Sequence, residues 1–179
     1  MEVQGLTDVV AIAAGGAFSL AVRSDGTVWA WGDNSHGELG VGTVVDSNVP
    51  VQVHTLTGVI AIAAGQYHAL ALTSAGKVYA WGLGSDGQVG DGLFSSSASP
   101  VAVTGLSSGV TAIAAGADHG LALLSGGTVD AWGDDSNGQL GNASTTNVDT
   151  PVAVGWLGGV QQISAGSLYS LAVTGSGQA

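Results

Sequence analysis

The stretch Trp31-Gly32-Asp33-Asn34-Ser35-His36-Gly37-Glu38-Leu39-Gly40 occurs three times in this chain with small changes. It returns at residues 81–90 and 132–141, each time as Trp-Gly, four variable residues, Gly, a polar residue, an aliphatic residue and Gly. We call this segment the W-G loop. A motif copied in such detail predicts a chain built from one repeated structural unit.

A second motif gives the same period. The segment Ile-Ala-Ala-Gly at residues 12–15 recurs with one substitution, and its glycines are 50, 51 and 50 residues apart, at Gly15, Gly65, Gly116 and Gly166. A period near 50 that contains several short strands is typical of propeller blades. We therefore divide a single domain, residues 1–179, into repeats at 9–58, 59–109 and 110–159 and a partial repeat at 160–179.

Each complete repeat contains four segments with the pattern of a strand. In the first repeat, residues 9–14 are apolar on both faces and predict a short strand buried on both sides. Residues 18–22 alternate large and small side chains, and residues 27–31 follow after a Ser-Asp-Gly turn. Residues 49–53 contain a proline, which suits an edge strand. The sequence thus predicts an all-β protein of four-stranded antiparallel blades, about three and a half per chain.

Composition limits the partners. Arg23 and Lys77 are the only basic residues, and the formal net charge is -11. Nucleic acids and anionic lipids are held by clustered Lys and Arg, so we expect neither nucleic acid nor a membrane surface as a partner.

The chain has no cysteine and no visible signal peptide at its start. A low-charge composition rich in small residues favours an extracellular or cell-surface bacterial protein, although localisation stays unknown.

The repeats share one joint pattern: Ala-Ala-Gly, an aromatic residue or His, Leu-Ala, a turn, Val-x-Ala-Trp-Gly, and then Gly-Glu/Gln-Leu/Val-Gly. This pattern resembles the regulator of chromosome condensation (RCC1) repeat, in its bacterial form of about 50 residues. The resemblance covers residues 9–174. It implies a propeller that seven such repeats close, and a protein-binding face made of loops. Members of that family include guanine-nucleotide exchange factors and chromatin binders, so fold alone does not choose an activity.

Several repeated residues are predicted to be structural. The tryptophans of the W-G loops are expected to wedge between blades, with the edge near Trp132 less packed. His68 and His119 share a repeat position with Phe18 and Tyr169, which indicates packing rather than catalysis. The structural repeat positions are Trp31, Gly32, Trp81, Gly82, Trp132, Gly133, His68 and His119.

The polar W-G loop residues are the candidate partner-facing positions: Asp33, His36, Glu38, Asp86, Asp134 and Asp135. Their oxygens could ligate calcium, but polar residues beside glycines are more typical of turns, and calcium needs six to eight oxygens. No catalytic constellation is evident, and Gly82–Gly87 matches a dinucleotide-binding pattern without the helix that it requires. We therefore expect no enzyme activity, no cofactor and no metal.

Two functional classes remain open. The first is a non-catalytic protein-interaction module that binds through blade-connecting loops. The second is a self-assembling structural protein, a ring or head-to-tail filament, because a partial propeller exposes different surfaces at its two ends. The partner would be protein: a homo-oligomer or the remainder of a longer propeller. Guanine-nucleotide exchange is a distant third, because the constant loop lengths leave no room for the inserted wedge that the resemblance associates with exchange.

Overall fold

The computed structural model describes residue 3 and residues 5–178, which contain fourteen strands. The outermost positions of the predicted domain 1–179, residues 1, 2, 4 and 179, lie outside the described part. The strands are β1 (Val9–Ala14), β2 (Phe18–Arg23), β3 (Val28–Gly32), β4 (Ser47–Val53), β5 (Val59–Ala64), β6 (His68–Thr73), β7 (Val78–Gly82), β8 (Ser97–Ala102), β9 (Val110–Ala115), β10 (His119–Leu124), β11 (Val129–Gly133), β12 (Val148–Ala153), β13 (Val160–Ala165) and β14 (Ser170–Thr174).

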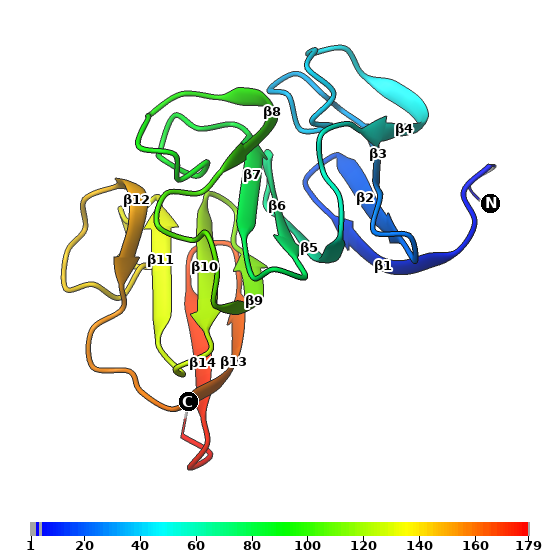
Figure 1. The fold of residues 1–179 in the computed structure, drawn as a ribbon. Coiled ribbons are helices and arrows are strands. Elements are labelled where there is room, and N and C mark those ends of the chain that lie inside the picture. The colour runs from blue at the N-terminus through cyan, green and yellow to red at the C-terminus, as the bar shows by residue number, and fades with distance from the viewer. Residues whose placement is uncertain (1–2, 4, 179) are drawn as a thin grey trace.

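The strands form three antiparallel four-stranded sheets and a two-stranded one, which confirms the predicted blades. Each sheet follows chain order, as in β1-β2-β3-β4, so each blade is a simple meander. Figure 1 shows the three complete blades following one another from the N-terminus, with β13–β14 drawn against β9 and β10 of the third blade. The described part of the chain contains no helix capable of spanning a bilayer.

Backbone hydrogen bonds join successive blades at two levels. At the inner corner, Gly16 N–H donates to Gln66 O (3.0 Å), and Gln66 N–H donates to Ala117 O (2.9 Å). At the hairpin, Gly26 O accepts from Val59 N–H, the first residue of the next blade (3.2 Å). A Cβ on Gly26 would lie 2.9 Å from the backbone of Gly58, the residue before Val59, which explains why a glycine holds this positive-φ turn.

The first strand of each blade is less buried than the sequence predicts. We expected residues 9–14 to be buried on both sides, but Ile12 is 77% exposed. Its counterparts Ile62 and Ile113 are only half-buried. The reason is geometric: these strands form the inner edge of the arc, and no described residues form a blade on the far side of β1. The apolar run marks a strand but overstates its burial.

The W-G tryptophans join each blade to the one before it. Trp81 and Trp132 are fully buried, and their indole N–H groups donate to Glu38 O (2.7 Å) and Gln88 O (2.9 Å) in the preceding W-G loops. Trp31 is only half-buried, and no W-G loop precedes it among the described residues. The wedge role is therefore seen for two of the three tryptophans. The expectation that Trp132 would be the loosest was wrong, because packing runs toward the preceding repeat rather than the following one.

Because each tryptophan packs toward the preceding repeat, the same mutation at the three equivalent tryptophans should have unequal effects on stability. Trp81→Ala and Trp132→Ala should each lower the free energy of unfolding by about 3–5 kcal/mol, because each empties a buried site and leaves a carbonyl without its donor. Trp31→Ala should cost clearly less. Denaturant unfolding of the three variants measures this, with Trp156→Ala as the control, because the Trp156 side chain is fully exposed. Equal losses at Trp31 and Trp81 would contradict the packing direction.

Candidate functional site

The three W-G loops lie along one edge of the blades, where they connect β3 to β4, β7 to β8 and β11 to β12. Each loop turns through glycines with positive φ, such as Gly37 (89°) and Gly40 (66°) in the first. Gly40 is also required by packing, because a Cβ there would lie 2.9 Å from the Trp81 indole nitrogen. The same glycines that shape the loop thus let the next blade's tryptophan approach.

The eighth residue of each W-G loop is polar, and its side chain closes the turn. Glu38, Gln88 and Gln139 each accept a hydrogen bond from the backbone N–H two residues earlier, at 2.8, 2.8 and 2.9 Å. All three side chains are almost or entirely buried. Glu38 was predicted to face a partner, but its side chain is 0% exposed and does not reach the surface.

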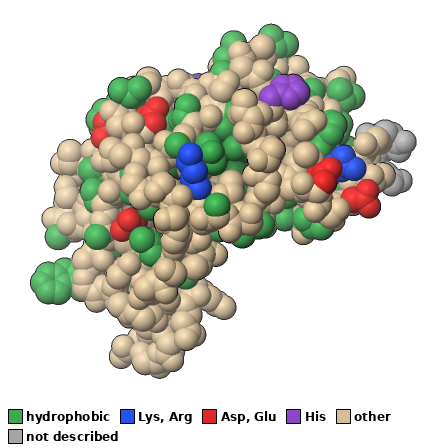
Figure 2. Space-filling model, in the orientation of Figure 1, with side chains coloured by type: hydrophobic (Ala, Val, Ile, Leu, Met, Phe, Trp, Pro, Cys, Tyr) green, Lys and Arg blue, Asp and Glu red, His purple; other side chains and the backbone are tan. Residues whose placement is uncertain are grey.

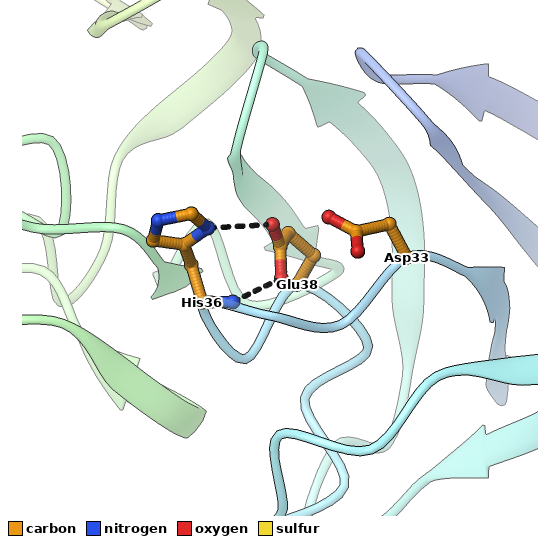
Figure 3. A group of neighbouring side chains, drawn as sticks. All are labelled: Asp33, His36 and Glu38. Carbon is orange, nitrogen blue, oxygen red and sulfur yellow. Dashed lines mark hydrogen bonds and ion pairs between the residues drawn. The ribbon is translucent and has the colours of Figure 1, made fainter.

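The candidate metal ligands Asp33, His36 and Glu38 do come together. Their ligand atoms lie within 4.8 Å of one another, and no other such group occurs in the described part of the chain. Figure 3 shows the Asp33 carboxylate directed toward Glu38, which also contacts the His36 ring (Nδ1 to Oε1, 3.3 Å). Asp33 in turn accepts from the Ser35 hydroxyl (3.0 Å). Three ligand atoms fall short of a calcium shell, and each group already has a partner within the turn.

The remaining acidic candidates differ in exposure. Asp33, Asp86 and Asp134 are partly exposed on the loop surface, whereas Asp135 is fully buried. Asp86 Oδ1 accepts from Asn147 Nδ2 of the following blade (3.0 Å), so this carboxylate links two loops. Direct contact with a partner therefore remains a prediction for Asp33, His36, Asp86 and Asp134, and it does not extend to Asp135.

Asp135 occupies a position built for an amide. Its counterpart Asn34 donates through Nδ2 to Thr43 O and Val45 O, both at 2.9 Å, and accepts from Leu39 N–H. Asp135 Oδ1 likewise accepts from Leu140 N–H (3.0 Å), but Oδ2 has no hydrogen-bond partner among the described residues. The carboxylate replaces the donor half of the amide and leaves a buried oxygen unpaired.

The aromatic or histidine position packs against the Ala-Ala-Gly corner. A Cβ on Gly65 would lie 2.2 Å from the His68 ring, and one on Gly116 would lie 2.0 Å from His119. His68 is fully buried, with neither ring nitrogen hydrogen-bonded, and desolvation lowers its pKa to about 4. Burial also lowers the pKa of His119. These histidines are positioned as packing groups and remain neutral at pH 7.

Sequence reasoning did not single out the exposed apolar side chains in the loops that follow the W-G loops. Val44, Val45, Leu93 and Phe94 are each more than half exposed. We call them the apolar loop edge. The sequence does contain a signal for these positions, because they are large apolar residues in loops that are otherwise rich in Gly, Ser and Thr.

The buried His68 predicts a pH-dependent stability. The unfolded chain binds a proton at His68 near pH 6.5, whereas the folded chain binds it only near pH 4, so stability falls as the pH falls through this window. The loss is about 3 kcal/mol for the shift of pKa. His68→Phe, which copies Phe18 of the first repeat, should remove this component. Unfolding of both proteins at pH 7 and pH 4 measures it; an identical pH dependence would contradict it.

Asp135→Asn should stabilise the protein. The new amide restores the donor that Asn34 provides in the first repeat, so we expect a gain of about 1–3 kcal/mol in the free energy of unfolding. Asn34→Asp is the matched reverse change and should destabilise. Thermal and denaturant unfolding at pH 7 measure both, and a gain from Asn34→Asp would show that the two loops are not equivalent.

Comparison with known proteins agrees with these repeats. A family model described as the regulator of chromosome condensation (RCC1) repeat matches residues 25–72, 75–123 and 126–173. A second model with that description matches residues 9–38, 59–88 and 110–139. The first model begins at the turn before β3 and ends in β6, so its unit spans two adjacent blades. One sequence repeat therefore contains the tryptophan strand of one blade and the inner strands of the next.

Two curated relatives illustrate the similarity. The E3 ubiquitin-protein ligase HERC2 of Homo sapiens is 37% identical over 168 residues, which is 91% of this chain and 4% of that protein. The mitochondrial RCC1 domain-containing protein RUG3 of Arabidopsis thaliana is 34% identical over 180 residues, which is 99% of this chain and 29% of that protein. Both relatives are eukaryotic, so they lend no support to the expected bacterial form.

Solved structures show the same blades. Human WBSCR16 superposes with a TM-score of 0.85 and 30% identity, covering 94% of this chain and 45% of that one. Prp20p from Saccharomyces cerevisiae superposes with a TM-score of 0.82 and 21% identity, covering 94% and 44%. The chain spans less than half the length of each of these proteins, and corresponds to about three and a half blades of their fold. With three successive repeats matched and relatives above 30% identity across nearly its whole length, this chain belongs to the regulator of chromosome condensation (RCC1) repeat family.

Proposed function

We propose that this chain is a non-catalytic protein-binding module that contacts its partner through the loop side of the blades. The observation that carries the proposal is the apolar loop edge, in which the loops of the first two blades each present two exposed apolar side chains. Exposed apolar residues gathered on one surface are characteristic of protein interaction sites.

The loops that carry this edge are fixed to the neighbouring blades. Gly42 N–H donates to Ala98 O (2.8 Å), and Gly92 N–H donates to Asp149 O (2.9 Å). The Asn34 side chain also holds the carbonyl of Val45 within the edge itself. Loops held in this way lose little conformational freedom on binding, which favours affinity.

The charge of the surface favours a basic or polar protein partner. Partly exposed Asp33, Asp86 and Asp134 lie on the W-G loops beside this edge, and the whole chain carries a net charge of -11. On the face drawn in Figure 2, the Lys and Arg side chains form two separate spots rather than a cationic patch. Association should therefore be faster at low salt with a basic partner, and nucleic acid is disfavoured.

The solved relatives support a protein partner as a class. One structure is described as Prp20p with its binding properties to Gsp1p and histones, and another as Kap60 bound to yeast RCC1 (Prp20). These are properties of those proteins. A non-catalytic role for this chain is further supported by its W-G loop carboxylates and His36, several of which are engaged in hydrogen bonds within or between loops.

A photo-crosslinking experiment tests the apolar loop edge. A photoreactive phenylalanine at Phe94 should give specific protein adducts in extracts of the source cells, and Val45→Ser in the same protein should reduce their yield about tenfold, the loss expected for one buried apolar contact. The matched control carries the photoreactive group at Val10, which is at least as exposed as Phe94 but lies on β1. Adducts of equal yield at Val10, or no effect of Val45→Ser, would contradict the proposal.

A further inference from the structure

The linker between β12 and β13 carries the most exposed large apolar side chain among the described residues. Trp156 is 101% exposed, so its indole packs against no other described residue. A Cβ on Gly155 or Gly158 would meet no atom within 4 Å, so the residues beside the ring leave it accessible. An indole buries roughly 150–250 Å² when it is packed, and none of this area is buried here.

This exposure does not depend on whether a further blade follows the linker. The counterparts of Trp156 are Thr55 and Gly105, which lie in the linkers before the second and third blades. Both are exposed, although a complete four-stranded blade follows each of them. The geometry of the repeat therefore places this position at the surface.

The backbone of the linker disfavours a tryptophan at this position. The angle φ is 74° at Thr55, 78° at Gly105 and 72° at Trp156, so the turn requires the left-handed region in all three repeats. Glycine adopts this region without strain, whereas a bulky side chain with positive φ is an outlier. Trp156 thus bears backbone strain that its side chain does not offset within the described chain. Such strain is concentrated at functional sites.

A second departure from the repeat lies at the same end of this blade. Asp130 occupies the position of Trp29 and Tyr79, and it pairs with Ala153, three residues before Trp156. Its side chain is partly exposed. The third repeat, residues 110–159, contains five aspartates and no Lys or Arg. The blade that carries the exposed indole is therefore acidic, which complements a partner with a basic surface.

We propose that Trp156 is the anchor of a second protein-binding surface. Its indole enters an apolar pocket of a partner protein, and basic residues at the rim of that pocket face Asp130. Tryptophan often dominates the binding energy of an interface when its ring is desolvated in a pocket. The W-G loop precedes β12 and the linker follows it, so the two lie at opposite ends of this strand (Figure 1). The new surface is thus separate from the apolar loop edge.

A protein pocket fits this site better than a lipid bilayer. Binding to a membrane surface needs a broad apolar face, and anionic lipids also attract clustered Lys and Arg. Here a single indole projects from a linker with three glycines, Gly155, Gly158 and Gly159, in a repeat without Lys or Arg. One ring on an acidic surface provides the anchor for a pocket rather than a face for a bilayer.

A photoreactive phenylalanine at Gly158 tests the surface with Trp156 intact, because a Cβ at Gly158 meets no atom within 4 Å. In extracts of the source cells the label should give discrete protein adducts, for which the unlabelled chain competes. Unlabelled Trp156→Gly should need about thirtyfold higher concentration for equal competition, the factor expected for one dominant tryptophan. Gly105 shows that the turn accepts this change.

Matched variants separate the anchor from general adhesion. Trp156→Thr combined with Thr55→Trp moves the indole to the same position of the first linker without changing the composition, and it should compete no better than Trp156→Gly. Val45→Ser should compete as well as the original chain, because Val45 belongs to the apolar loop edge. Asp130→Asn should compete less well at low salt and equally well at high salt, because salt screens the attraction to basic residues. Melting curves establish that each variant folds.

Three results would overturn the proposal. The first is the absence of competed adducts, or equal competition by the original chain and either tryptophan variant. The second is a loss of competition in Val45→Ser, which would merge this surface with the apolar loop edge. The third is a blue shift of tryptophan emission on phosphatidylcholine vesicles that disappears in Trp156→Gly, which would assign the indole to a membrane. An Asp130→Asn effect that is independent of salt would remove the basic rim from the partner.

Discussion

The hydrogen bond from a buried indole N–H to a carbonyl of the preceding W-G loop gives this fold its direction. It occurs at Trp81 and at Trp132, and in each case the same ring fills the apolar space between two blades. A repeat cannot complete its own interface, because the wall and the carbonyl belong to one repeat and the tryptophan to the next. Stability must therefore arise mainly between neighbouring repeats, as it does in other repeat proteins.

Most of the blade architecture was predictable from the sequence because it depends on local patterns at fixed spacing. The period, the glycine turns and the alternating segments predicted about three and a half four-stranded blades, and the four strands expected in the first repeat lie within two residues of their observed bounds. The direction of packing was not predictable. A periodic sequence is consistent with tryptophans that pack backward or forward along the chain, so the looseness of Trp31, rather than Trp132, required three-dimensional information.

The candidate site was predictable as a group of loops but not residue by residue. Polar residues beside glycines indicate turns, yet sequence does not distinguish an acidic residue that faces solvent from one that closes the turn. Asp33 lies at the surface, whereas Glu38 and Asp135 are buried and bond to backbone N–H groups of their own loops. The apolar loop edge was missed for the opposite reason, because short apolar segments such as Val44-Val45 usually indicate burial.

The direction in which the tryptophans pack also explains why the two ends of the described chain differ chemically. One end presents Trp31, half-buried beside Ile12, with no W-G loop before it among the described residues. The other end presents a wall and a carbonyl without a ring, between the third blade and β14. Such surfaces are complementary rather than identical, so any contact between them is head-to-tail and not two-fold symmetric.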